Sequence, residues 1–488
     1  MFFKIQFLSI FCVFSTFAQT PFLSIPNDLS TRSKSPNDAF TVVDAENNRF
    51  TVFLDDGKTL NGYMYSENLE PLGKFTSKGL SNFYNEIIGQ TLKNGQIKLF
   101  LKNQNNKNFG SVLFDFDRKA SIETEYGFKL KDEVYLQSHS YKDKFYIITV
   151  TKRSSILNVY TFNHDGKFGK KEFDFSNTFF GDRMNKQVNL FQLLTEPKNY
   201  ATEGSVVKIA ESNPNNIAIA SNMCKIYDRG STFILTIDEG QLFTYVFEFG
   251  MPDLTVNLKM IEKEQLPFKG IIASSNSYLF EDKIFQISAL SDTLVFTIKN
   301  IETKEELKKI HLSKNEEITF KNGSIIQEGT SMGSDNQREL ERTSQFLRKI
   351  TSGDIGVAVL KINKGYQITM GGNKEISPSG GGGFMMVPTY AGGATNSMNG
   401  SFVYSYNPTF YAFSSYKFNK STRIECLFSE TFQHVTGVLP QNVFDKIRAY
   451  TLQNPKAKAE NVFIMNDFFV YGKYNSKEDS YELIKFSE

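Results

Sequence analysis

The chain has 488 residues, of which 40% are hydrophobic and 22% charged, with 55 Lys and Arg against 53 Asp and Glu. A formal net charge of +2 excludes the broad basic field that binds nucleic acid or anionic lipid headgroups. The sequence contains 47 Phe and 22 Tyr but no Trp. Such aromatic richness, together with many Asn, Asp, Ser and Gly turn residues, favours strands over helices.

Residues 1–18 have the pattern of a secretory signal peptide. Lys4 precedes a short apolar run from Ile5 to Phe14, and Ala18 is a small residue at the cleavage position before Gln19. After this segment, no stretch approaches the roughly 18 to 20 apolar residues that a membrane-spanning helix needs. The sequence therefore predicts an exported mature chain, residues 19–488.

A unit of polar turn, apolar strand, second turn and Tyr- or Phe-bearing strand recurs along the mature chain. Six copies begin at Asn47, Asn94, Lys142, Asp228, Glu281 and Asn466. A seventh copy is split: "NKGYQITMGG" from Asn363 supplies a turn and a strand, and "FYAFSSYKFNKSTRIECLF" from Phe410 supplies a later hairpin. The spacing of about 50 to 85 residues falls in or just above the range of propeller blades.

The repeats predict an all-β chain, namely a single β-propeller of about seven blades over residues 19–488. Six or eight blades remain open, and two stacked β-sandwiches are the alternative, because strand spacing alone does not separate these architectures. Helical insertions are expected near 334–350, where Arg348 and Lys349 suit a helix end, and near 439–454, where Pro440 suits a first turn.

The stretch "SPSGGGGFMMVPTYAGGATNSMNG", residues 377–400, is the third insertion. It is not a phosphate-binding loop, because no Lys-Ser or Lys-Thr follows the glycines. A flexible stem with an apolar tip fits a finger that binds a partner, and a self-packed or disordered loop is the alternative. The candidate partner-binding residues are Phe384, Met385, Met386, Val387, Pro388 and Tyr390.

The sequence offers no catalytic or metal-binding motif. The histidines at 139, 164, 311 and 434 are scattered, and His164 in "FNHDGK" is interpreted as a solvated turn residue. Acid pairs such as Asp55-Asp56 fall in hairpin turns, and no G-x-S-x-G elbow occurs. Neither a catalytic residue nor a metal or cofactor is therefore predicted. Cys224 and Cys426 either form a disulfide or are two buried free thiols.

The short Phe-rich leader ending "FAQT", the Lys-, Asn- and Phe-heavy composition and the blade pattern resemble exported proteins of the Bacteroidota. Surface proteins that leave that group of bacteria by the type IX system usually end in a β-sandwich sorting domain, whereas "YNSKEDSYELIKFSE" resembles a last propeller strand. The resemblance therefore implies a periplasmic location. It also implies an accessory subunit of an outer-membrane machine, such as the plug-type subunit of the type IX translocon.

Two hypotheses about function follow. The first is a non-enzymatic periplasmic subunit that docks on an outer-membrane barrel protein or its complex and plugs or gates it through residues 377–400. The alternative is a ligand-binding or enzymatic propeller that acts on a glycan or peptide at its central channel, with acids or Tyr converging at one mouth.

Overall fold

Antiparallel β-sheets make up most of the protein. The computed structural model describes residues 19–28, 36, 38–56, 59–77, 84, 86–103, 105–127, 129–195, 206–267, 270–331, 334–373, 407–417, 421–453 and 457–487. Strands β1 to β32 account for most of this part of the chain, and five short α-helices lie between them. The prediction of an all-β chain is confirmed.

The first half of the chain forms three four-stranded meanders. Sheet B consists of β2 (Asp38–Asp44), β3 (Arg49–Asp55), β4 (Leu60–Ser66) and β5 (Pro71–Ser77), with a 3₁₀ turn at Ala45–Asn47. Sheet C consists of β6 (Glu86–Lys93), β7 (Gln96–Lys102), β8 (Phe109–Asp115) and β9 (Ala120–Tyr126). Sheet D consists of β10 (Glu133–Tyr141), β11 (Lys144–Thr151), β12 (Ile156–Asn163) and β13 (Phe168–Asp174).

A small hairpin, sheet E, interrupts this series before two larger sheets follow. Sheet E pairs β14 (Phe180–Gly181) with β15 (Gln187–Val188). Sheet F consists of β16 (Val207–Ile209), β17 (Cys224–Asp228), β18 (Thr232–Ile237), β19 (Phe243–Gly250) and β20 (Thr255–Glu262), with β16 parallel to β17. Sheet G consists of β21 (Ser274–Phe280), β22 (Lys283–Leu290), β23 (Thr293–Asn300) and β24 (Glu306–Ser313).

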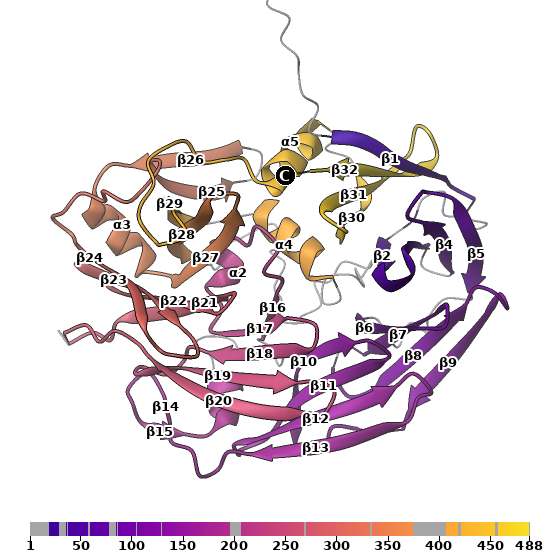
Figure 1. Cartoon of the computed structure of the whole chain (residues 1–488), viewed down its shortest axis with the longest axis horizontal. Coiled ribbons are helices and arrows are strands. Elements are labelled where there is room, and N and C mark those ends of the chain that lie inside the picture. The colour runs from indigo at the N-terminus through magenta and orange to yellow at the C-terminus, as the bar shows by residue number, and fades with distance from the viewer. Residues whose placement is uncertain are drawn as a thin grey trace, which may run out of the picture.

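The last two sheets depart from simple chain order. Sheet H has the order β26-β25-β29-β28-β27, formed by β25 (Ile325–Ser331), β26 (Ser334–Leu340), β27 (Asp354–Ile362), β28 (Gly365–Asn373) and β29 (Ser421–Phe428). Sheet A joins β30 (Lys458–Met465), β31 (Phe468–Asn475) and β32 (Ser480–Phe486) to β1 (Gln19–Pro26). The first strand thus pairs with the last, and Figure 1 shows the seven larger sheets following one another around a ring.

Apolar side chains fill the spaces between neighbouring sheets. Between sheets C and D, the Phe100 and Phe145 rings stack with centroids 4.1 Å apart. Gly89 of β6 makes room for this contact, since a Cβ atom there would lie 2.4 Å from the Phe145 ring. Alternating strand residues therefore build a separate core on each face of a sheet.

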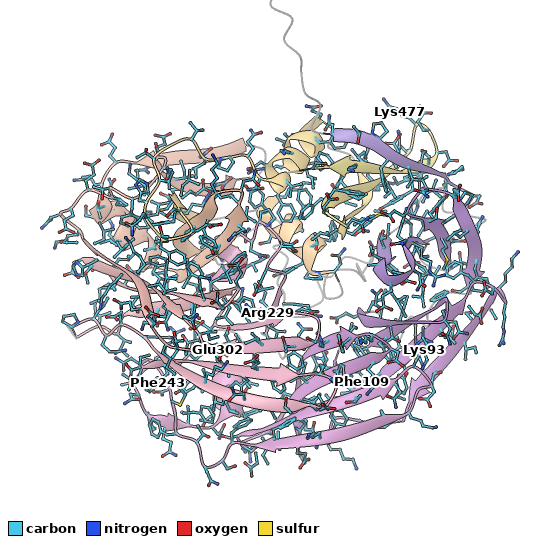
Figure 2. The ribbon with its side chains drawn as sticks, in the orientation of Figure 1. Lys93, Phe109, Arg229, Phe243, Glu302 and Lys477 are labelled. Carbon is cyan, nitrogen blue, oxygen red and sulfur yellow. The ribbon has the colours of Figure 1, made fainter. Side chains whose placement is uncertain are left out.

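Polar contacts at hairpin turns also tie adjacent sheets together. Lys93, the last residue of β6, forms an ion pair of 3.0 Å with Asp143, after β10. Arg229, after β17, donates to the carbonyl of Glu281, after β21, at 2.6 Å. Figure 2 labels Arg229 near the middle of the ring and Lys93 toward its lower right. These contacts fix the positions of neighbouring turns.

Five helices lie between or beside the sheets. They are α1 (Leu190–Thr195), α2 (Ile217–Ala220), α3 (Thr343–Ile350), α4 (Pro408–Lys417) and α5 (Val443–Gln453). Figure 1 shows α4 and α5 between sheets H and A, with α2 near the middle of the ring. We call the region between sheets H and A, with these helices, the H–A junction.

The structure corrects two predicted elements and confirms a third. Residues 334–350 are not one helix: 334–340 form β26, because backbone pairing with β25 (Ile325↔Leu340) overrides a helical sequence pattern. Residues 410–417 are not a strand but part of α4, whose Phe410 and Phe413 are both buried. The predicted helix near 439–454 is confirmed, although it begins at Val443, after Pro440.

Candidate binding site

The predicted partner-binding residues, Phe384, Met385, Met386, Val387, Pro388 and Tyr390, lie outside the described residues, as does the whole of 377–400. The nearest described residues before and after this segment are Asn373 and Asn407, and both belong to the H–A junction. Asn373 is the last residue of β28, and Asn407 directly precedes α4. These two flanks, the end of β28 at Asn373 and the start of α4 at Asn407, define the region of the candidate site.

The first flank, the end of β28, is held by close backbone packing. Asn373 pairs with Asp354 of β27 on one side and with Ser421 of β29 on the other. A Cβ atom at Gly371 would lie 2.4 Å from the carbonyl oxygen of Thr422, and one at Gly372 would lie 2.6 Å from that of Ile350. Only glycine fits here, so the two glycines of "ITMGG" let the strand end tightly against its neighbours.

The second flank, the start of α4, is held by one buried asparagine. The Asn407 side-chain oxygen accepts hydrogen bonds from the backbone N–H groups of Thr409 and Phe410, at 3.0 and 3.1 Å. Its side-chain nitrogen donates to the carbonyl of Val462 in β30 at 2.8 Å. Asn407 thus caps the helix and attaches it to sheet A at the same time.

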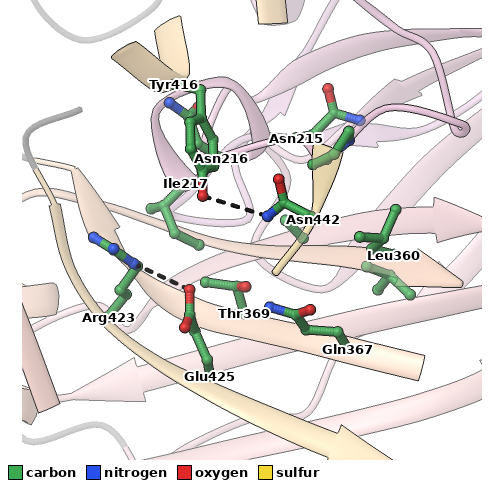
Figure 3. A pocket seen from close by; sticks show the side chains of 13 residues that line it. Asn215, Asn216, Ile217, Leu360, Gln367, Thr369, Tyr416, Arg423, Glu425 and Asn442 are labelled. Carbon is green, nitrogen blue, oxygen red and sulfur yellow. Dashed lines mark hydrogen bonds and ion pairs between the residues drawn. The ribbon is translucent and has the colours of Figure 1, made fainter. Parts of the chain in front are cut away.

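A polar pocket lies in the H–A junction, between the faces of β27, β28 and β29 and the segments that begin α2 and α5 (Figure 3). Its lining residues are Pro214, Asn215, Asn216, Ile217, Ala358, Val359, Leu360, Gln367, Thr369, Tyr416, Arg423, Glu425 and Asn442. Ala358, Thr369 and Glu425 are register partners across three strands and so share one face of sheet H.

Two arginines and two glutamates form a network beside the pocket. Arg423 binds Glu328 at 2.7 Å and Glu425 at 3.4 Å, and Arg448 of α5 reaches Glu328 at 3.3 Å. Burial alone would lower the pKa of the Arg423 guanidinium, but the Glu425 and Glu328 carboxylates raise it. The four charges balance, so the network contributes no net charge at the pocket.

The Tyr416 hydroxyl is fixed from the opposite side. It donates to the Asp445 carboxylate and accepts a hydrogen bond from the Asn442 side-chain nitrogen at 3.3 Å. Burial first, and then the Asp445 charge, raise the pKa of the Tyr416 hydroxyl. The phenol is therefore a protonated structural group that holds α4 against the start of α5.

Gln367 and Thr369 differ from these residues because their polar groups are open to the pocket. Gln367 is 7% exposed, and its side-chain oxygen has no hydrogen-bond partner among the described residues. Figure 3 shows Gln367 and Thr369 side by side on β28, facing Asn442. The cavity measures about 30 Å³, which is room for about two water molecules.

The alternation of polar and apolar residues in β28 indicates part of this pocket. In "GYQITMGG", polar Gln367 and Thr369 alternate with Tyr366, Ile368 and Met370, so they occupy the face opposite these buried side chains. Tertiary packing brings Glu425 of β29 and Tyr416 of α4 next to Gln367 and Thr369. Strand alternation could have found the two β28 residues, and only the fold could add the others.

The remaining chemical predictions have mixed outcomes. Asp56 accepts the backbone N–H of Thr59 at 2.6 Å, which confirms its turn role. His164 does lie in a turn, but it is buried and not solvated, because its Nδ1 contacts Thr91 Oγ1 at 3.1 Å in the space between sheets. Cys224 and Cys426 are both free and buried, so the disulfide alternative is wrong.

Within the described ranges, no cluster of three or more His, Cys, Asp or Glu side chains could hold a metal ion. In the same part of the chain, every helix is too short or too polar to cross a membrane.

A second buried charged group lies between sheets F and G. Asp238 contacts Lys225 at 3.1 Å and Lys263 at 3.5 Å, and all three side chains are at most 1% exposed. Hydroxyls of Thr244 and Ser277 also donate to the carboxylate. Burial alone would raise the pKa of Asp238, but the two lysines lower it. Both lysines share this one carboxylate, and their ammonium groups also donate to the Asn276 side chain and to the carbonyls of Asp238 and Gly240, so each buried charge has partners.

No protein-family model and no curated protein matches the sequence. Among solved structures, AofleA from Arthrobotrys oligospora aligns with a TM-score of 0.25 and 7% identity, over 70% of this chain and 82% of that one. A prolyl endopeptidase aligns with a TM-score of 0.32 and 7% identity, over 90% of this chain and 45% of that one. TolB from Acinetobacter baumannii aligns with a TM-score of 0.24 and 9% identity, over 57% and 54%. Similarity this low carries no functional argument.

Proposed function

We propose that the ring of sheets is a single seven-bladed β-propeller. Sheets B, C, D, F, G, H and A would be the blades, and the hairpin of sheet E an insertion between the third and fourth. The pairing of β1 with β32 supports this proposal, since joining the first and last segments in one sheet closes a ring and leaves only short edges.

We further propose that the protein is a non-enzymatic periplasmic subunit, exported by residues 1–18, that binds an outer-membrane barrel protein or its complex. Residues 377–400 would enter the partner and plug or gate it. The observation that carries this proposal is the anchoring of both flanks: β28 ends against Ile350 and Thr422, and Asn407 ties α4 to β30. A loop whose two ends are fixed on rigid elements is positioned for recognition.

Two acids of the described chain, Asp238 and Glu328, form structural ion pairs, which supports a binding role. Asp238 is enclosed by Lys225 and Lys263, and Glu328 by two arginines, so each charge is committed to an internal ion pair. Groups arranged in this way stabilise the positions of sheets and helices.

The test is affinity purification from native membranes, comparing the full chain with a length-preserving variant in which Phe384, Met385, Met386 and Val387 become Ser. We expect a large outer-membrane barrel protein to accompany the full chain and to be lost from the variant, with an unchanged unfolding temperature. The matched control replaces Asn396, Ser397 and Met398 by Ala, Ala and Leu in the same segment. Equal recovery of a barrel protein with every variant would refute the role of residues 384–387, and recovery of the full chain alone would refute the subunit proposal.

A further inference from the structure

Two side chains in the H–A pocket have polar groups that the folded chain leaves open. The Gln367 oxygen is buried without a described partner, and no hydrogen bond joins the Thr369 hydroxyl to another residue in the described ranges. An unpartnered buried acceptor costs free energy, because it has lost its hydrogen bond to water and gained none in the fold. A ligand that supplies a donor at this position would recover that cost.

The surrounding charges select a neutral ligand. Arg423 and Arg448 are balanced by Glu328 and Glu425, and the Asp445 carboxylate accepts hydrogen bonds from the Tyr416 hydroxyl and the Asn442 backbone, so a charged ligand would meet no unpaired opposite charge there. The Glu425 carboxylate lies opposite Thr369 in the strand register and offers an acceptor, while the Gln367 amide offers both an acceptor and donors. A group that carries one acceptor beside one donor complements this surface.

The size of the cavity narrows the choice further. A space of about 30 Å³ accepts about two water-sized polar atoms, and is too small for a sugar ring. The oxygen and nitrogen of a carboxamide, joined through one carbon, are two such atoms. Ala358 and Leu360 of β27, the register partners of Thr369 and Gln367, also line the pocket and would contact the apolar remainder of the ligand.

We propose that the H–A pocket binds a carboxamide group, which pairs side by side with the Gln367 amide. The side-chain amide of Gln forms the same two-point pairing with adenine in DNA recognition. The second N–H of the ligand would donate to Thr369 or Glu425. This inference stands on the pocket alone and does not depend on an outer-membrane partner or on residues 377–400.

Acetamide is the probe, and saturation-transfer NMR on the full mature chain is the measurement. Acetate and acetamidinium are the comparison probes, because each has the methyl group and planar shape of acetamide but carries a charge. We expect transfer to acetamide and about tenfold less to either ion, since each would lose a hydrogen bond to the amide. Equal transfer to all three compounds would show an adventitious additive only and would overturn the proposal.

Substitutions of pocket residues test whether acetamide binds in the H–A pocket. Gln367→Leu should reduce acetamide transfer about tenfold, and Thr369→Val should reduce it several-fold. Gln327→Leu is the matched control: Gln327 lies on β25 of the same sheet and also has a buried side-chain oxygen without a described partner, but it does not line the pocket. Undiminished transfer with the folded Gln367→Leu variant, or an equal loss with Gln327→Leu, would overturn the assignment.

Discussion

The C–D and F–G interfaces and the H–A junction join neighbouring sheets in different ways. Between C and D, Phe100 and Phe145 stack directly, and between F and G a buried Lys–Asp–Lys cluster is fully enclosed. Between H and A, helices α4 and α5 fill the space, and a pocket with open polar groups is left beside them.

This difference suggests that the C–D and F–G interfaces stabilise the fold, whereas the H–A junction offers a surface that can bind a ligand. The stacked rings between C and D and the ion pairs between F and G stabilise the fold, whereas an unpartnered group such as the Gln367 oxygen contributes no stability and, because it lines a pocket, remains available to a ligand. Substitutions in the two kinds of region should therefore have unequal effects on the free energy of unfolding.

The largest effect is expected from Asp238→Asn in the F–G cluster. The substitution keeps the shape but leaves Lys225 and Lys263 buried without their anion, which should lower the free energy of unfolding by about 3 to 5 kcal/mol. Urea unfolding at pH 7 measures it. Asp253→Asn, at an exposed turn, is the control and should change little. A loss below about 1 kcal/mol would mean that the cluster is hydrated and not enclosed.

A smaller loss is expected from Phe145→Leu between sheets C and D. The stacking with Phe100 disappears and part of the ring volume is left empty, so the free energy of unfolding should fall by about 1 to 2 kcal/mol. Phe179→Leu, at a ring that is 47% exposed, should cost less than about 0.5 kcal/mol in the same urea titration. Equal losses would show that the C–D contact is not specifically packed.

The third prediction concerns acid pH and His164. Burial, and then the charges of Lys98 and Lys93, lower the pKa of His164 below its usual 6.5, so the unfolded chain takes up the proton first. The stability that neutral His164 contributes is present above pH 6.5 and is lost as the pH falls from 6.5 through its lowered pKa. His164→Gln should therefore lose less stability between pH 7 and about pH 5 than the wild type does.

Exposed His311 provides the control for this pH series. Substitution of this exposed side chain, His311→Gln, should leave the urea midpoints close to those of the wild type. If His164→Gln also follows the wild type, His164 is protonated in the folded protein as readily as in the unfolded one.

Much of the sheet structure followed from alternation and turn residues, as at Asp56 and Asn94, because a strand with one buried face carries its own period-two signal. The secondary-structure predictions were wrong where long-range contacts determine the local structure. Residues 334–340 look helical but pair with β25, and Phe410 to Lys417 look like a strand but form a helix capped by Asn407. The pocket could be predicted only in part, since Gln367 meets Tyr416 and Glu425 through the order of strands in sheet H.

The smallest effect on stability is expected at the H–A pocket. Gln367→Leu and Thr369→Val remove polar groups that have no partner among the described residues, so the free energy of unfolding should change by less than about 0.5 kcal/mol, or rise for Gln367→Leu. Urea unfolding on the same scale as Asp238→Asn tests the contrast directly. A loss above about 1 kcal/mol would mean that the Gln367 and Thr369 side chains make stabilising contacts in the folded chain. The H–A junction would then resemble the C–D and F–G interfaces. If acetamide binding is lost while the free energy of unfolding stays unchanged, the pocket groups serve ligand binding and not stability. The H–A pocket would then differ in role from the C–D and F–G interfaces.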